Sequence, residues 1–471
     1  MATTPPLSPS IAAAKTSSVE GWIRKLSGSA LARTDALSPP STPENHPSLK
    51  RKRATSAPCA YMMSTRNTSP KRARRDSDTE ILPTHSVSAA GAASNVSAMT
   101  LNETNTFSPS SSQAGARSPR RSISPSRDKF TTLAVAAPPT IKKPSSALTE
   151  PLPPEVSRVM DLIEEDLGSG WIPAEFKTLI KEDKDIGYQR IEAQAWDSSE
   201  ARNPLDSDIL REVKKIWSNA EMCQQMGRDE NAWCMDVIVP LIKLAVSLEG
   251  ADKFWLQSVQ SQAIACDFLS SASDGTGKHY ILDRKADFTL SFSHMTSPFK
   301  DLYTRLRTTN NYVISHMTDA FTKTTALFSC VEVKPASGDH TEAEYQLSIW
   351  MAASLRKKMQ LARRVGLVDK SNLVEPCFAI VGHRMYVYFA YVGSEERDTV
   401  HILGPEVGLL SLCETSSVSG IFRALRLWRN VIKYGRDEGN GGFWGSFMGV
   451  VLQKLAEDAD EGHNAALASS P

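Results

Sequence analysis

The sequence predicts an α/β (α+β) domain with a mixed central β-sheet flanked by helices, preceded by a long N-terminal arm. Of the 27 prolines, 16 lie before residue 151, whereas only four of the 34 aromatic residues (15 Phe, 10 Tyr and 9 Trp) do. After residue 151, stretches with the 3.6-residue period of a helix are interspersed with short runs of aromatic and β-branched residues. Strands interspersed with helices in this way indicate one sheet covered by helices.

Residues 1–150 are predicted to be a mostly disordered, Ser/Pro-rich arm. With so few large apolar side chains, the arm cannot bury enough surface to offset the entropy of ordering. Two basic clusters in it have the composition of a nuclear-import signal or of a nonspecific phosphate contact, and a solvated run of charges is the alternative. The clusters consist of Lys50, Arg51, Lys52 and Arg53, and of Lys71, Arg72, Arg74 and Arg75. We therefore expect the protein in the nucleus, brought there by an import carrier.

The composition of the whole chain argues against several classes of protein. The net charge of +1 gives no overall attraction to nucleic acid, so any such binding must depend on local charge. Seven cysteines without a Cys-x-x-Cys pair argue against a disulfide framework and against a zinc site. The start of the sequence has no signal-peptide pattern, and no run of 18 apolar residues follows. We expect an intracellular protein with no membrane segment.

The first folded segment, residues 151–228, is predicted to be a helical lead-in. Two short helical stretches lie within residues 151–182, separated by a Gly-Ser-Gly sequence and a proline. A helical period resumes after them, where Ile209, Val213 and Trp217 are spaced by four.

The core of the domain is predicted over residues 229–455, with a flexible tail at 456–471. It starts with a long apolar helix in which Pro240 is expected to cause a kink or a break. Strand-like runs follow at 254–264, 279–292 and 326–334. The next helix is predicted to begin at Thr341, with Glu344 completing a capping box. Two strands around a turn at 382–384, a strand at 399–403 and a helix at 417–435 complete the order.

The strand predicted at 326–334 carries a carboxylate and an ammonium in an otherwise apolar run. In a strand, residues i and i+2 point to the same face about 6.6 Å apart, so Glu332 and Lys334 project together. The pattern Glu-x-Lys also occurs three times in predicted helices, where the same spacing separates the side chains by about 200°. The strand context therefore distinguishes Glu332 and Lys334 from the other three pairs.

An acidic partner is available on the strand predicted at 279–292. Asp287 alternates there with apolar residues, and it can approach Glu332 if the two strands are neighbours. Two carboxylates held together are costly unless a cation lies between them, and such an oxygen-rich site suits Mg²⁺ or Mn²⁺. Lys334 would then contact the attacking water or the charged transition state of phosphodiester cleavage. A buried ion pair of Lys334 with Glu332 or Asp287 is the alternative that the residues leave open.

The pattern of Asp287 followed by Glu332-x-Lys334 on a strand–strand–helix run resembles the PD-(D/E)XK nuclease superfamily. More narrowly, it is similar to the nuclease-like domain of many fungal proteins. The block VEVKPASGDHTEAEYQLSIWMAA, residues 331–353, carries most of the likeness. The resemblance covers roughly residues 155–450 and implies a PD-(D/E)XK nuclease-like domain over 151–455 with a restriction-endonuclease-like core. It also implies a metal-dependent (endo)nuclease that acts on DNA.

The resemblance further implies roles for individual residues. Asp287 and Glu332 match the metal-binding carboxylates, and Lys334 matches the catalytic lysine. Glu230 corresponds to an acid that the first core helix often contributes, and Gln346 to a helix position that lines the site. A helix-start acid favoured by the helix dipole is the alternative for Glu230, and a structural hydrogen bond is the alternative for Gln346.

The sequence departs from the family pattern in two places. Ala286 stands where a proline usually precedes the first acid, and residues 294–326 form an insertion as a loop or helix. Asp319 in this insertion is a rival for the metal carboxylate of Asp287, although its surroundings lack strand character.

A basic group near the end of the helix that follows Lys334 could contact phosphates of nucleic acid. It consists of Arg356, Lys357, Lys358, Arg363 and Arg364. Favourable placement of cations at a helix C-terminus is the alternative. The function predicted from these observations is a nuclease with DNA as its partner. The other possibility is a catalytically inactive nuclease-like fold that binds nucleic acid or protein in the nucleus. The residues do not determine the oligomeric state.

Overall fold

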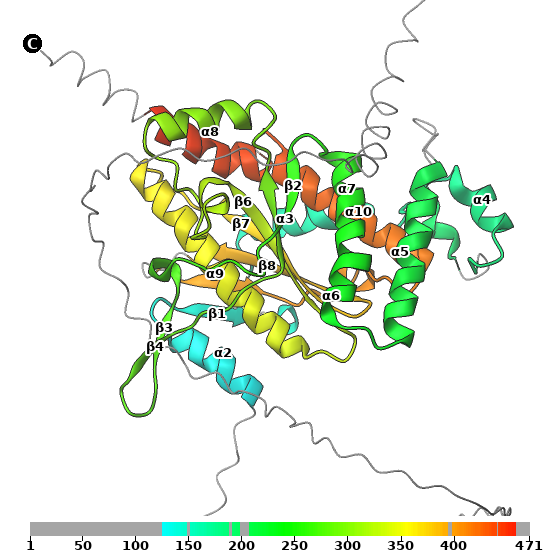
Figure 1. Ribbon diagram of the computed structural model, residues 1–471, viewed down its shortest axis with the longest axis horizontal. Helices are drawn as coiled ribbons and strands as arrows, with labels where there is room; N and C mark the ends of the chain where they lie inside the picture. The colour runs from blue at the N-terminus through cyan, green and yellow to red at the C-terminus, as the bar shows by residue number, and fades with distance from the viewer. Residues whose placement is uncertain are drawn as a thin grey trace, which may run out of the picture. The chain divides into compact units, whose positions relative to one another are not determined.

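The computed structural model describes residues 125–147, 151–187, 191–197, 207–393, 398–439 and 441–457 (Figure 1). Both predicted import clusters lie outside the described residues. The last described residues, 449–457, are helical, so the structure extends two residues beyond the predicted start of the tail.

A seven-stranded mixed sheet forms the centre of the domain, as the sequence predicts (Figure 1). Its strand order is β1-β9-β8-β7-β6-β5-β2. The pairs β6–β7 and β1–β9 are parallel, and the other neighbours are antiparallel. The strands are β1 (Thr140–Lys143), β2 (Phe254–Ser258), β5 (Phe288–Phe292), β6 (Leu327–Lys334), β7 (Val374–Val381), β8 (Arg384–Val392) and β9 (Val400–Leu403). Strands β3 (Ser271–Ser273) and β4 (His279–Ile281) form a separate antiparallel hairpin.

Helices cover both faces of this sheet (Figure 1). Helix α9 lies across one face, and α10 packs on the other, where Trp428 contacts Phe378 of β7 with ring centroids 4.2 Å apart. The central strands β6 and β7 are buried along nearly their whole length, which explains why their sequences are almost continuously apolar. The helices are α2 (Pro125–Val135), α3 (Pro154–Glu164), α4 (Phe176–Glu182), α5 (Ser207–Gln225), α6 (Glu230–Ala232), α7 (Val239–Glu249), α8 (Phe299–Thr308), α9 (His340–Arg364) and α10 (Val418–Arg436).

Residues 125–147 are part of the folded domain, which corrects the prediction that the whole of 1–150 is disordered. Strand β1 extends the edge of the sheet beside β9, and α2 packs against α9 through Phe130 and Tyr345. The sequence TIKK of β1 is too short and too charged to show a strand period. It is a strand because β9 supplies its hydrogen-bonding partner, and that contact is not visible locally.

The long apolar helix predicted from residue 229 is present, but it is not broken at Pro240. Residues Trp233–Ile238 form a π-helical segment between α6 and α7, and Pro240 lies in the first turn of α7, where a missing N–H costs little. The stretch Glu230–Glu249 is long and apolar enough to cross a membrane, but 56% of it is buried inside the protein. Its packing against α10 identifies it as a core helix.

Other boundaries also differ from the prediction. The run predicted as a strand at 254–264 is β2, which ends at Ser258. Helix α9 begins at His340, and the side chain of Asp339 caps it by accepting from the Thr341 N–H at 2.8 Å, so the predicted Thr341 capping box is wrong. The run predicted as one strand at 279–292 is split between β4 and β5. The segment between them, residues 282–287, passes beside the site described below.

A β-bulge at Ser329 breaks the regularity of β6 just before the predicted site residues. Ser329 has a positive φ of 61°, and the register between β5 and β6 shifts opposite it. Its N–H donates to Glu375 at 2.8 Å and its hydroxyl donates to the Pro376 carbonyl at 2.6 Å. A bulge of this kind bends a strand and re-aims the side chains beyond it. Glu332 and Lys334 lie beyond the bulge on the same strand.

Candidate active site

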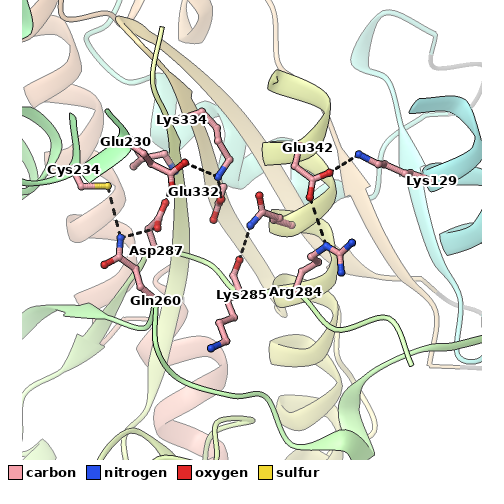
Figure 2. A network of polar contacts seen from close by, with 12 residues as sticks. Lys129, Glu230, Cys234, Gln260, Arg284, Lys285, Asp287, Glu332, Lys334 and Glu342 are labelled. Carbon is pink, nitrogen blue, oxygen red and sulfur yellow. Dashed lines mark hydrogen bonds and ion pairs between the residues drawn. The ribbon is translucent and has the colours of Figure 1, made fainter. Parts of the chain in front are cut away.

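The structure brings Asp287, Glu332, Lys334 and Glu230 together at one end of the central sheet (Figure 2). Asp287 directly precedes β5, and Glu332 and Lys334 end the neighbouring strand β6. Glu230 begins α6, where Asp229 caps the helix by accepting from the Ala232 N–H at 2.9 Å. Residues from three separate parts of the sequence, 230, 287 and 332–334, thus converge from one helix and two neighbouring strands.

Asp287 is held in a fixed orientation by hydrogen bonds to both of its carboxylate oxygens. The main-chain N–H of Val333 donates to Oδ2 at 2.7 Å, and the side-chain amide of Gln260 donates to Oδ1 at 2.8 Å (Figure 2). The residue is 5% exposed. Since Val333 lies between Glu332 and Lys334, its N–H fixes Asp287 directly beside the Glu-x-Lys sequence.

Lys334 bridges two carboxylates. Its Nζ lies 2.7 Å from Oε1 of Glu332 and 3.0 Å from Oε2 of Glu230. The Glu332 side chain is almost fully buried, whereas the Glu230 side chain is 41% exposed. The second oxygen of Glu332, Oε2, is buried and has no hydrogen-bond partner in the described structure.

The pKa values of these groups reflect an excess of negative charge in a buried place. Burial, together with the neighbouring charge of Asp287, raises the pKa of Glu332 to about 8. Burial also raises the pKa of Asp287, although Gln260 and the Val333 N–H counteract the rise. Burial acts to lower the pKa of Lys334, but the attraction of Glu332 and Glu230 is stronger and the pKa is raised. Lys334 is therefore charged at neutral pH.

The side chains of Asp287, Glu332 and Glu230 line a cavity of about 410 Å³ that is open to solvent. Its walls are formed by Glu230, Gln260, Asp283, Arg284, Lys285, Ala286, Asp287, Glu332 and Gln346. Gln346 of α9 reaches the opposite wall, where its amide donates to the Lys285 carbonyl at 3.4 Å. The cavity thus has carboxylates at its base and basic residues along its rim.

The donor set fits a hard divalent cation. The unpartnered buried oxygen of Glu332 and the adjacent carboxylate of Asp287 supply oxygen ligands, and a cation between them would relieve their repulsion. Within the described part of the chain, no group of three or more His, Cys, Asp or Glu residues is arranged to hold a metal by itself. Two carboxylates are sufficient for Mg²⁺, which usually keeps several waters.

A sequence model of the PD-(D/E)XK nuclease superfamily matches residues 181–444, which is more than half of the chain. The chain belongs to this superfamily. The match includes all four converging residues and the seven-stranded mixed sheet except β1. No curated protein matches the chain. PD-(D/E)XK nucleases generally use divalent metals and act on nucleic acid, which agrees with the carboxylates at the base of the cavity.

Asp319, the rival carboxylate, is not among the residues that line the cavity of this PD-(D/E)XK domain. Its Oδ1 accepts from the N–H groups of Phe321 and Thr322 at 2.9 and 3.2 Å, so it caps a short turn in the insertion. The geometry therefore favours Asp287 as the partner of Glu332.

Three of the five basic residues predicted to contact nucleic acid are buried, so that prediction is wrong for them. Arg356, Lys357 and Lys358 are 6%, 5% and 3% exposed. Arg356 donates to main-chain carbonyls near β1, and Lys358 forms a buried ion pair with Glu375. The other two, Arg363 and Arg364, lie at the surface near the C-terminus of α9, where Arg363 pairs with Asp398 and Arg364 with Asn311.

Gln260 is the site residue that the sequence did not indicate. It lies in the loop after β2, and its amide contacts Asp287 at 2.8 Å and the Cys234 sulfur of the π-helical segment at 3.9 Å. A glutamine in a polar loop carries no periodic signal, so its role depends entirely on the tertiary fold.

Proposed function

We propose that this chain is a metal-dependent nuclease that hydrolyses phosphodiester bonds of DNA. The observation that supports this most strongly is the convergence of Asp287 and Glu332 in the wall of an open cavity, with the Lys334 ammonium bound to Glu332. A purely structural ion pair would not need the buried, unpartnered oxygen of Glu332 or the second carboxylate of Asp287 beside it.

In this proposal Asp287 and Glu332 would hold Mg²⁺ or Mn²⁺. The metal would polarise the phosphate and lower the pKa of a bound water. The Val333 N–H and Gln260 keep the Asp287 carboxylate oriented toward the cavity. Because the pKa of Lys334 is raised, its ammonium keeps its proton and can stabilise negative charge that develops on the phosphate.

Glu230 and Gln346 have supporting roles. Glu230 accepts from Lys334 at 3.0 Å and holds the ammonium beside Glu332. Gln346 ties α9 to the segment that leads into Asp287, which fixes one wall of the site. We expect loss of either side chain to reduce activity less than loss of Lys334.

The proposal is tested by a cleavage assay in which the full chain is incubated with plasmid or single-stranded DNA in the presence of Mg²⁺, Mn²⁺ or EDTA. Asp287→Asn and Lys334→Ala should each reduce the rate on the order of 100-fold or more, with folding unchanged by circular dichroism. Lys214→Ala is a matched control, since the triplet Glu212-Val213-Lys214 repeats Glu-Val-Lys on the surface of α5. It should leave the rate unchanged.

If the wild-type protein cleaves none of these substrates, the proposed nuclease activity is contradicted. The second possibility, a nuclease-like domain that only binds nucleic acid or protein, would then be supported if Lys334→Ala lowered the unfolding temperature. Its ammonium is bound to two carboxylates, so its loss would leave two unpaired acids in a partly buried place.

We further propose that the two basic clusters of the arm direct the protein to the nucleus through an import carrier. The support is their composition alone: four basic residues in each cluster. Replacing both sets by alanine in a fluorescent fusion should move the protein out of the nucleus. An unchanged distribution would overturn this part of the proposal.

A further inference from the structure

A β-hairpin directly precedes the segment that lines the candidate active site. Strands β3 and β4, residues Ser271–Ile281, pair with each other and not with the central sheet, and they extend away from it (Figure 1). The base of the hairpin is anchored, because Ser271 pairs with Ala137 and the flanking Leu282 is buried. Beyond that base, every residue from 273 to 281 is exposed.

The tip of the hairpin is well formed despite its exposure. The Asp274 carboxylate accepts from the N–H and hydroxyl of Thr276 at 2.9 and 2.6 Å and from the N–H of Lys278 at 3.0 Å. Ser273 and His279 form a hydrogen bond of 3.0 Å across the two strands. The hairpin therefore presents its side chains on an ordered support.

The side chains on the returning strand contribute little to the core of the domain. Tyr280 and Ile281 are 44% and 46% exposed, although an aromatic and an aliphatic residue next to each other would normally be buried. Lys278 adds a positive charge just before this strand. Large apolar groups kept at the surface beside a cation are the combination that proteins use to bind single-stranded nucleic acid.

The hairpin leads directly into the cavity. Ile281 is followed by Leu282 and then by residues 283–287, all of which line the cavity and end at Asp287. The Cα atoms of Tyr280 and Asp283 are three residues apart, so they lie within roughly 11 Å of each other. A nucleic-acid strand in the cavity would reach the hairpin within a few nucleotides.

The segment between hairpin and cavity carries two basic residues, Arg284 and Lys285, next to Asp283. Arg284 is held in place, since it lies 3.6 Å from Glu342 and 5.4 Å from the centre of the Tyr345 ring (Figure 2). The ammonium of Lys285 points away from the carboxylates at the base of the cavity (Figure 2). A positive rim above a negative base can hold the phosphates on either side of a bond positioned at that base.

We propose that the β3–β4 hairpin binds unpaired nucleotides next to the cleavage site, with Tyr280 contacting a base and Lys278 and Lys285 contacting phosphates. This rests on the proposed function in taking nucleic acid as the ligand. The face of a base is open to a side chain only where the base is unpaired. The preferred substrate therefore contains a single-stranded segment, such as an overhang beside a duplex.

Fluorescence anisotropy of the full chain in EDTA, where metal-dependent cutting is absent, tests this inference. The probes are a labelled thymidine oligonucleotide, a blunt duplex, and a duplex with a single-stranded overhang. Tyr280→Ala should weaken binding of the first and third probes roughly 5- to 150-fold and leave the blunt duplex unchanged. The slope of log affinity against log salt should not change, because no charge is removed.

Replacement of the lysines, in contrast, should change the slope of log affinity against log salt. Lys278→Ala with Lys285→Ala should reduce the salt slope by about 0.7 for each phosphate of a single strand that is no longer neutralised by a lysine. Met295→Ala with Lys300→Ala is the matched control: it removes an exposed apolar side chain and an exposed lysine near α8, beyond the far end of β5 from Asp287. Thermal unfolding of all variants should match the wild type, since the replaced side chains are exposed.

Two results would overturn the inference: equal binding of blunt and overhang duplexes, or hairpin variants that bind like the control pair. The basic clusters of the arm are present in every variant, so their nonspecific binding cancels in the comparison. Failure of the proposed function is separable. If the overhang preference depends on Tyr280 but no metal supports cleavage, the hairpin binds nucleic acid and the catalytic proposal alone is wrong.

Discussion

Arg356 on α9 donates a hydrogen bond of 2.9 Å from its Nη2 atom to the hydroxyl of Thr140, the first residue of β1. The same nitrogen donates to the carbonyls of Pro138 and Pro139, each at 3.0 Å. The other terminal nitrogen donates to the Phe268 carbonyl and the Ser270 hydroxyl. One buried guanidinium thus links residues 138–140, which lie before the region that matches the superfamily model, to helix α9 in the centre of the domain.

Removal of residues 1–150 should therefore destabilise the domain, whereas removal of 1–124 should not. A fragment that starts at residue 151 lacks β1 and three acceptors of Arg356, and each missing hydrogen bond to a charged group costs about 1.5–3 kcal/mol. Thermal unfolding followed by circular dichroism compares the two fragments. Equal unfolding temperatures would show that β1 is dispensable.

Gln260 should control metal affinity through Asp287. Gln260→Met keeps the length of the side chain but removes the amide that donates to Oδ1, so Mn²⁺ affinity should fall about 10- to 100-fold. Calorimetric titration with Mn²⁺ measures this without depending on cleavage. Ser258→Ala is the control, since the Ser258 hydroxyl donates only a long hydrogen bond of 3.4 Å to the amide oxygen of Gln260 and does not contact Asp287. An unchanged affinity in Gln260→Met would remove Gln260 from the site.

The buried ion pair of Lys358 and Glu375 should be more costly to break than to replace. Its atoms are 2.5 Å apart, and Glu375 also accepts from the N–H of Ser329 at the bulge. Glu375→Leu alone leaves an unpaired buried ammonium and should lower the free energy of unfolding by about 3–5 kcal/mol. Addition of Lys358→Met to this variant should restore much of the lost free energy of unfolding.

Urea unfolding of the three proteins checks this. Lys433→Met, which breaks an exposed pair with Glu165, should cost no more than about 1 kcal/mol. A double variant less stable than Glu375→Leu would mean that the lysine has favourable partners of its own.

His316 should make the domain less stable in acid. Burial, and then the charges of Lys358 and Lys357, hold its pKa well below the ordinary value of 6.5. Below pH 6.5 the unfolded chain takes up a proton that the folded chain does not, so stability falls by up to about 1.4 kcal/mol per pH unit. In His316→Leu this contribution should be absent, so stability should fall less steeply below pH 6.5 than in the wild type, where His294, His340 and His383 contribute in the same direction.

Urea midpoints at several pH values from neutral to acid compare the two proteins. His279→Leu, at an exposed position in the β3–β4 hairpin, is the control and should follow the wild type. Parallel curves for wild type and His316→Leu would contradict the assignment.

The sequence was informative where local pattern and tertiary environment agree. Helix α10 and strands β6 to β9 follow from their apolar periods, and Asp287, Glu332 and Lys334 follow from the two-residue period of strands. Long-range contacts determined the rest. Arg356 and Lys358 appeared to be surface cations at a helix end, but their partners come from distant segments and from β7, so the chain buries them. Neither the bulge at Ser329 nor the loop position of Gln260 has a local signal.

The parallel pairing of β1 with β9 also governs when the sheet can be completed during synthesis. Thr140 pairs with Val400, which leaves the ribosome 260 residues later. At about 5–20 residues per second, the first strand waits roughly 13–52 s for its partner to be made. Strand β1, which is translated first, is thus among the last to join the sheet. A nascent chain that ends before β9 has no partner strand for β1.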